Sequence, residues 1–167
     1  NHNKRKFKDK ILGYHRFPAY NLSVESLTKA GDEILKFKPE YIIGYSVALD
    51  MFARVNYKRQ EDFQRLELKA VIASTENFPS ENSSEIISKV FNSPVVMEYG
   101  SVETDAIAYT DVNNIYKTFW RNYFIEVIDN DFGKEILITS LYPRCFPLIR
   151  YNLGDIIELT DNNNNLD

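Results

Sequence analysis

Three short apolar segments, separated by stretches with helical spacing, constrain the fold of this chain most strongly. Residues 41–45, 69–73 and 94–99 are predicted to be strands. The apolar run in the second segment is typical of a strand that is covered on both faces, as in parallel sheets. The order strand, helix, strand, helix, strand makes two crossover units, which nearly always wind right-handed into a parallel sheet. The sequence therefore predicts an α/β fold, a parallel sheet with flanking helices.

Helices are expected in three places. Ser23 can cap a helix that Pro39 ends. A second helix is expected over about 47–58, with its apolar side chains on one face. A third begins at Ser80 or Ser83 and leads into the last of the three strands.

After about residue 105 the helical spacing disappears. Strand-like segments follow one another closely there, and we expect an antiparallel β meander or small barrel. These segments are 107–109, 123–128, 135–139 and 148–159. The predicted organisation is therefore a parallel α/β subdomain over 1–104, an antiparallel β subdomain over 105–160, and a loose tail of Asn and Asp over 161–167.

The composition excludes several classes of protein. In this chain of 167 residues, 44% hydrophobic and 26% charged residues are normal for a soluble globular protein. No apolar run approaches the ~20 residues of a membrane helix. The net charge of −4 gives nucleic-acid binding no general support, and we expect the basic run over 4–10 to be a solvated helix face or a frayed end. The single cysteine excludes a disulfide framework, and the cytoplasm is the expected location.

A binding site is expected where the parallel strands end. Ligands of open parallel sheets lie beyond the carboxyl ends of the strands. The segments that follow the three predicted strands are polar and would lie side by side on one edge. They are Gly44-Tyr45-Ser46, Ser74-Thr75-Glu76-Asn77 and Tyr99-Gly100-Ser101-Val102-Glu103-Thr104.

The third of these segments is the most informative. Gly100 could let the backbone approach a ligand closely, and Tyr99 could stack on a flat ring. Glu103 is suited to a magnesium ion that is held together with ligand phosphates. The alternative is a tight turn with a solvated glutamate, and the residue types alone favour neither reading.

A fourth polar segment follows the apolar run near the C-terminus. Gly154 and Asp155 form a pair that is most often a hairpin turn. Arg150 and Asp155 could instead engage a ligand.

Other reactive residue types are expected to be structural. His2 and His15 are the only histidines and give no zinc site or catalytic triad. Cys145 is expected to pack as a small apolar residue, although Arg144 beside it could activate a thiolate. An aromatic cluster is more often core than a ligand box; its members are Tyr116, Phe119, Trp120, Tyr123 and Phe124.

Four stretches of this sequence together resemble the adenylate-forming (acyl-CoA synthetase) superfamily. The resemblance is strongest to phenylacetate–coenzyme A ligase and its capsule-biosynthesis relatives, and it covers about residues 20–160. The stretches keep the family's order and spacing. They are 37–45 (FKPEYIIGY), 73–77 (ASTEN), 98–103 (EYGSVE) and 147–155 (PLIRYNLGD). The fold that this resemblance implies is half of the family's large N-terminal domain.

The resemblance implies a two-step reaction. In that family a carboxylate attacks the α-phosphate of ATP to give an acyl-adenylate and pyrophosphate, and a thiol, usually coenzyme A, then displaces AMP. The implied ligands are ATP or AMP, Mg²⁺, coenzyme A and a small carboxylic acid. By the positions that match, the adenine would be bordered by Ser74, Thr75 and Glu76, and the nucleotide pocket would be lined by Tyr99, Gly100 and Ser101. Glu103 would hold magnesium, and Asp155 would bind the ribose hydroxyls. The residues near the acyl pocket would be Gly44, Tyr45 and Ser46.

Departures from the family pattern affect the predicted activity. Val102 stands where the family usually has a hydroxyl that contacts phosphate, unless Ser101 or Thr104 substitutes for it. Asn152 replaces a residue that is basic in many relatives.

The resemblance also implies parts that this sequence does not show. The family has a phosphate loop upstream of these motifs and a catalytic lysine in a C-terminal domain, and neither appears here. The first residue is Asn rather than Met. We therefore expect a fragment of a ligase that is inactive alone and could self-associate through apolar surface exposed by truncation. The alternative is a non-catalytic nucleotide-binding or interaction module of the same fold.

Overall fold

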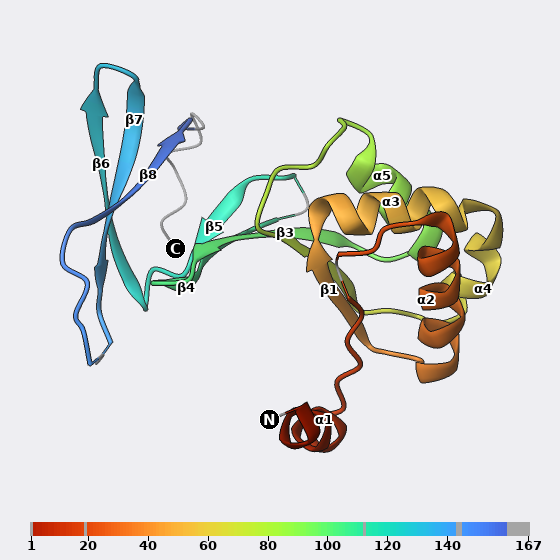
Figure 1. Ribbon diagram of the computed structural model, residues 1–167. Coiled ribbons are helices and arrows are strands. Elements are labelled where there is room, and N and C mark those ends of the chain that lie inside the picture. Colours follow the sequence, from red (N-terminus) through yellow and green to blue (C-terminus); the bar gives the residue numbers. More distant parts are fainter. Residues whose placement is uncertain (1, 19, 112, 143–144, 160–167) are drawn as a thin grey trace. The chain divides into compact units, whose positions relative to one another are not determined.

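A computed structural model describes residues 2–18, 20–111, 113–142 and 145–159 of the chain (Figure 1). The predicted tail over 161–167 and Arg144 lie outside these ranges. The chain divides into two compact units, Asn1–Val95 and Val96–Asp167. In chain order the elements are α1 (His2–Ile11), α2 (Val24–Phe37), β1 (Tyr41–Tyr45), α3 (Ser46–Asn56), the 3₁₀ helix η1 (Tyr57–Arg59), α4 (Gln60–Gln64), β2 (Ala70–Ser74), α5 (Ser83–Phe91), β3 (Val95–Ser101), β4 (Asp105–Thr110), β5 (Tyr116–Thr118), β6 (Tyr123–Asn130), β7 (Gly133–Ser140) and β8 (Tyr151–Ile157).

The first unit contains the parallel pair β1 and β2. Its register runs from Tyr41 opposite Ala70 to Tyr45 opposite Ser74, so both strands end at the same level. Helix α3 contacts both strands and also packs against α2 and α5 (Figure 1). The side chain of Val71 in β2 is fully buried. This strand–helix layer therefore carries the first two predicted site segments at one edge.

Helix α2 shows how local sequence sets the boundaries of these elements. The hydroxyl of Ser23 accepts a hydrogen bond from the N–H of Ser26 and so caps the helix. At the other end Lys38 adopts a left-handed conformation (φ 54°), and its N–H bonds to the Ile34 carbonyl at 2.9 Å. Pro39 follows and cannot continue the helix. The helix predicted between Ser23 and Pro39 is confirmed.

Three phenylalanines hold the helical layer of the first unit together. The rings of Phe52, Phe63 and Phe91 come from α3, α4 and α5. Their centroids lie 5.5–5.7 Å apart, with two edge-to-face contacts and one stacked contact. Phe63 and Phe91 are fully buried.

The second unit is antiparallel. Strand β4 pairs with β3 on one side and β5 on the other, while β6, β7 and β8 form a three-stranded meander (Figure 1). A buried core joins strands of both groups and consists of Ile107, Tyr123, Ile136 and Ile138. Tyr99 of β3 and Leu153 of β8 pack against this core.

The predicted fold class is confirmed. The protein has a mixed five-stranded sheet with parallel and antiparallel pairs and flanking helices, and a separate three-stranded antiparallel sheet. The antiparallel pairing begins earlier than expected, because β3 itself pairs with β4. Within the part of the chain that the structure describes, no helix is long and apolar enough to cross a membrane.

Candidate functional site

Two of the predicted site segments meet at the carboxyl ends of β1 and β2. Ser46 begins α3, and its buried side chain donates a hydrogen bond from Oγ to the Glu76 carbonyl at 2.7 Å. The same Oγ lies 3.2 Å from the Asn77 carbonyl oxygen. The geometric rule for parallel strands therefore correctly places these two segments side by side.

The second segment contains a strained backbone position. Thr75 has a φ of 85°, which is rare for a residue with a branched Cβ. Its side chain is exposed, as are those of Glu76 and Asn77. Backbone strain of this kind costs about 1–3 kcal/mol and persists where the surrounding structure enforces it, often at ligand sites. The loop after β2 thus combines a strained backbone position with polar side chains that face solvent.

The third and fourth predicted segments also meet. The Tyr99 hydroxyl donates a hydrogen bond to Asp155 Oδ2 at 2.5 Å, although the two residues lie 56 positions apart in the chain. Burial of the Tyr99 phenol, together with its bond to the negatively charged Asp155, raises the pKa of this tyrosine well above its usual range. The Tyr99 ring also makes an edge-to-face contact with Tyr116, with centroids 6.0 Å apart.

A bulge in β8 presents Asp155. Glu135 of β7 pairs with Ile156 and Leu137 pairs with Asn152, so residues 153–155 of β8 lie opposite the single Ile136. Gly154 within the bulge has φ 78°, a conformation that favours glycine. The hairpin turn expected for the Gly-Asp pair is therefore wrong. The pair lies inside a strand, and the extra residues redirect the Asp155 side chain.

Asn152 and Arg150 support this region instead of lining it. Asn152 Oδ1 accepts the Gly154 N–H at 2.7 Å, and Asn152 Nδ2 donates to Glu135 Oε2 at 2.8 Å. The Arg150 guanidinium donates to Glu126 Oε2 at 3.2 Å. Of the two residues proposed to engage a ligand from this segment, Asp155 is the one that contacts another predicted site residue.

The loop between β3 and β4 is closed by its own hydroxyls. Ser101 Oγ and Thr104 Oγ1 lie 3.0 Å apart, and Thr104 is fully buried. The Val102 side chain is 98% exposed. The position where the family has a phosphate-contacting hydroxyl is thus accessible but apolar, and the Thr104 hydroxyl is buried within the loop.

Glu103 of this loop is an exposed carboxylate. A hydrogen bond from the Ser101 hydroxyl, and a second from its own backbone N–H, lower the pKa of this carboxyl, so it is ionised at neutral pH. Among the described residues, no group of three or more His, Cys, Asp and Glu side chains could hold a metal ion. Since Mg²⁺ usually keeps several waters and binds one or two carboxylates plus substrate phosphates, one exposed glutamate fits this ion when a nucleotide is present.

Gly100 is required by the fold. A Cβ atom at this position would lie 2.1 Å from the backbone oxygen of Asp105, because the strands converge where the β3–β4 register shifts. The close approach expected at this glycine is therefore made by the neighbouring strand. The packing of the two strands therefore explains why residue 100 is a glycine, and no ligand is needed to explain it.

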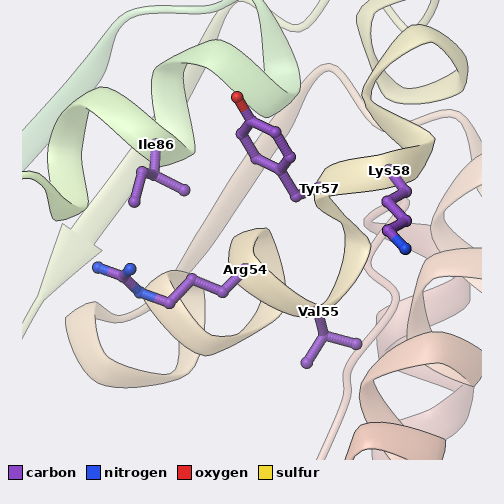
Figure 2. A pocket seen from close by; sticks show the side chains of 5 residues that line it. All are labelled: Arg54, Val55, Tyr57, Lys58 and Ile86. Carbon is purple, nitrogen blue, oxygen red and sulfur yellow. The ribbon is translucent and has the colours of Figure 1, made fainter.

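The surface of the described residues includes two hollows of similar size. One, of about 510 Å³, adjoins Glu103 and is lined by Glu103, Asp105, Tyr142, Cys145, Phe146, Leu148 and Tyr151. The other, of about 550 Å³, lies on the helical layer of the first unit and is lined by Arg54, Val55, Tyr57, Lys58 and Ile86 (Figure 2). Figure 2 shows Arg54 and Lys58 extending to opposite sides. None of the motif residues lines this second hollow.

The remaining candidates have mixed outcomes. Cys145 is exposed, so the expectation that it packs is wrong. His15 is partly exposed and bonds to Glu33 at 3.0 Å, as expected for a surface or partly packed residue. Of the aromatic cluster, Tyr123 is core at 3% exposure, whereas Trp120 and Phe124 are mostly exposed. Tyr116 contacts the ring of Tyr99. Its place in the aromatic cluster is the one sequence signal for this contact.

Comparisons with known proteins concern the fold of the chain as a whole. No protein-family model matches the chain. Protein CapK of Staphylococcus aureus is 25% identical over 157 residues, which cover 90% of this chain and 33% of CapK. A 2-hydroxyisobutyryl-CoA ligase, solved in complex with 2-HIB-AMP and CoA, superposes with a TM-score of 0.66 at 16% identity over 86% of this chain and 35% of that chain. CmiS6 superposes with a TM-score of 0.51 at 14% identity over 68% of this chain and 31% of its own.

These matches have one feature in common. The chain spans about a third of the length of the proteins that it matches. The similarity to the CoA ligase extends through most of this chain at low sequence identity, so it establishes the architecture. The chain has the fold of the matching part of that 2-hydroxyisobutyryl-CoA ligase.

Proposed function

We propose that this chain is the nucleotide-holding part of an ATP-dependent, AMP-forming acid–thiol ligase. The observation that carries the proposal is the contact between Tyr99 and Asp155. These residues come from two separate motifs whose implied roles are adjacent, since one contacts the adenine and the other the ribose. The similarity in fold to a CoA ligase and the contact between the proposed adenine residue and the proposed ribose residue support the same function.

The ribose and the adenine of the nucleotide each have proposed partners in this chain. Asp155 accepts hydrogen bonds from the ribose hydroxyls, for which a carboxylate offers two oxygens. The Tyr99 ring gives the adenine a stacking surface, worth about 1–3 kcal/mol by analogy with nucleic-acid stacking. By the resemblance, Ser74, Thr75 and Glu76 would border the adenine, and Gly100 and Ser101 would line the nucleotide pocket.

Ser46 takes a supporting role in this proposal. Its buried hydroxyl bonds to the carbonyls of Glu76 and Asn77. It therefore holds the adenine segment in place and leaves Gly44 and the half-exposed Tyr45 toward the acyl pocket.

Glu103 is the proposed magnesium ligand. When bound, Mg²⁺ offsets the charge that keeps a carboxylate nucleophile away from the triphosphate. The contribution of this chain is an ionised and exposed carboxylate.

The substrate class follows from the resemblance. We propose a carboxylic acid of the phenylacetate type as the acyl donor and coenzyme A as the acceptor. The triphosphate loop and the catalytic lysine would belong to a longer parent protein. This chain alone would then bind nucleotide without forming an adenylate.

A second candidate function is supported by Val102. A fully exposed apolar side chain stands where the family has a phosphate-contacting hydroxyl. This favours a nucleotide-binding module that does not catalyse phosphate chemistry. The two functions share the nucleotide site and differ in the reaction.

Pyrophosphate measurements separate these candidates. The chain incubated with ATP, Mg²⁺ and a panel of acids should release no pyrophosphate, and acid-dependent release would contradict the idea of a partial site. The full-length parent should exchange pyrophosphate into ATP in the presence of aryl acids. If a folded parent binds ATP but gives no exchange with aryl or short aliphatic acids, the binding module is the correct function.

A further inference from the structure

We propose that the hydroxyl of Tyr99 is a positioning group that holds Asp155 in the orientation in which its second carboxylate oxygen accepts a ribose hydroxyl. The inference rests on the proposed nucleotide function and adds a residue-level device to it. Tyr99 would then have two roles. Its ring would stack on the adenine, and its hydroxyl would orient Asp155 toward the ribose.

The contact itself is strong for a tyrosine. An O–H donor 2.5 Å from a carboxylate oxygen is at the short end of the range for bonds to an ionised acceptor. Such bonds are about twice as strong as those between neutral groups. Asp155 is exposed and Tyr99 is half-buried, so the better-ordered partner is the tyrosine.

The two partners rest on one core. Tyr99 packs against the cluster that contains Ile107 and Ile138, and so does Leu153, which lies two residues before Asp155. The start of the β8 bulge and the tyrosine are therefore fixed relative to each other.

The bulge alone does not fix the side-chain orientation of Asp155. Gly154 precedes it and restricts the backbone little, and Asn152 fixes the Gly154 N–H without contacting the carboxylate. An exposed aspartate next to a glycine would exchange among side-chain rotamers. The Tyr99 hydroxyl selects one of them before any ligand binds, which reduces the ordering that nucleotide binding must supply.

Replacing Tyr99 with phenylalanine separates the two actions. Phenylalanine keeps the ring and removes the hydroxyl, so stacking remains and positioning is lost. Tyr116→Phe is the matched control, because the ring centroids of Tyr116 and Tyr99 lie 6.0 Å apart and Tyr116 lies on β5 of the same sheet. Asp155→Ala removes the group through which the hydroxyl is proposed to act.

The test is a binding measurement by calorimetry on the 167-residue chain, using AMP and 2′,3′-dideoxy-AMP as probes. We expect Tyr99→Phe to weaken AMP binding by about two- to tenfold, the range of one hydrogen bond. The affinity of Tyr99→Phe for 2′,3′-dideoxy-AMP should equal that of the wild type. In the Asp155→Ala variant, adding Tyr99→Phe should leave the affinity for AMP unchanged. Equal weakening of both nucleotides, or no weakening of either, would overturn the proposal.

A measurement without nucleotide keeps the proposal distinct from the proposed function. The ring-carbon chemical shifts of Tyr99, measured by NMR at neutral pH, should change in Asp155→Ala, since the carboxylate accepts the Tyr99 hydroxyl. Unchanged shifts would show that the contact is absent in solution and would overturn the positioning role alone. If the shifts change but the wild type binds neither nucleotide, the proposed function fails and the inference fails with it.

Discussion

The hydroxyl of Ser46 donates a hydrogen bond to the backbone carbonyl of Glu76 at 2.7 Å and so ties the start of α3 to the loop after β2. The serine is fully buried, whereas the glutamate side chain is exposed. One predicted site segment thus provides the internal support of the other. The shape of the loop after β2 therefore depends on a buried residue at the start of α3.

Removing this support should loosen the loop. Ser46→Ala deletes a hydroxyl that bonds to two carbonyls, and we expect the free energy of unfolding to fall by about 1 kcal/mol. Amide hydrogen exchange over residues 75–77 should become faster. Ser84→Ala, a helical position that is partly exposed, is the control and should change stability by less than about 0.5 kcal/mol. Unchanged stability and exchange in Ser46→Ala would contradict the bonding described.

Gly100 should tolerate no side chain. A methyl group there would lie 2.1 Å from the Asp105 oxygen and 2.9 Å from the Ala106 Cα, both backbone atoms that cannot move independently. Gly100→Ala is expected to reduce the free energy of unfolding by at least about 1–3 kcal/mol, measured in urea. Gly44→Ala is the matched control, since its methyl group would meet only the Leu49 side chain at 3.4 Å. Similar stabilities for the two variants would contradict the β3–β4 geometry.

Asp111 should contribute to stability in a pH-dependent way. Hydrogen bonds from the backbone N–H groups of Ile115 and Asn113, together with nearby Lys117, lower the pKa of this carboxyl below its usual 3.8. A lowered folded pKa means that the stabilisation is present above the unfolded value and is lost as pH falls through the folded value. The stability difference between wild type and Asp111→Asn should therefore shrink from pH 6 to pH 3.

The control for this prediction removes a charge elsewhere. Asp131→Asn changes an exposed residue of the β6–β7 turn and accounts for the general effect of net charge. A stability gap for Asp111→Asn that stays constant between pH 6 and pH 3 would show that the carboxylate charge makes no contribution.

Cys145 should react with thiol reagents in the native protein. Its side chain is exposed and lines the hollow beside Glu103. Ellman's reagent is expected to label one thiol per chain without denaturant, and Cys145→Ser should abolish the signal. Labelling that appears only in urea would mean that the cysteine is packed, as the sequence suggested.

The elements that sequence predicts well are those set by neighbours in the chain. Ser23 and Pro39 bound α2 through a local cap and a missing N–H. The apolar run of β2 identifies a buried strand, because its side chains have no other stable location. In each case the cause lies within a few residues of the element.

The features that sequence does not predict depend on long-range pairing. Strand β5 (Tyr116–Thr118) is short and contains a polar lysine, and it exists because β4 pairs with it. The last strand begins at Tyr151 rather than near residue 148, since Arg150 has a left-handed φ of 47°. The Gly-Asp pair was expected in a turn, yet pairing with β7 makes it a bulge.

In the candidate site too, some features follow from the sequence and others depend on contacts between distant residues. The carboxyl-end rule brings Ser46 to the loop after β2, because strand direction determines that edge. The contact between Tyr99 and Asp155 spans 56 residues, and no local pattern encodes it. The resemblance to a family suggested the two residues separately, and their hydrogen bond required the structure.

The most direct test of this account is an NMR titration of the 167-residue chain with AMP, following its backbone amides. If the chain holds the nucleotide as proposed, shifts will concentrate in residues 74–77, residues 99–103 and Asp155, and Asp155→Ala will weaken them. If millimolar AMP shifts no amide, or shifts only those around Arg54 and Lys58 at the second hollow (Figure 2), the proposed nucleotide site is wrong.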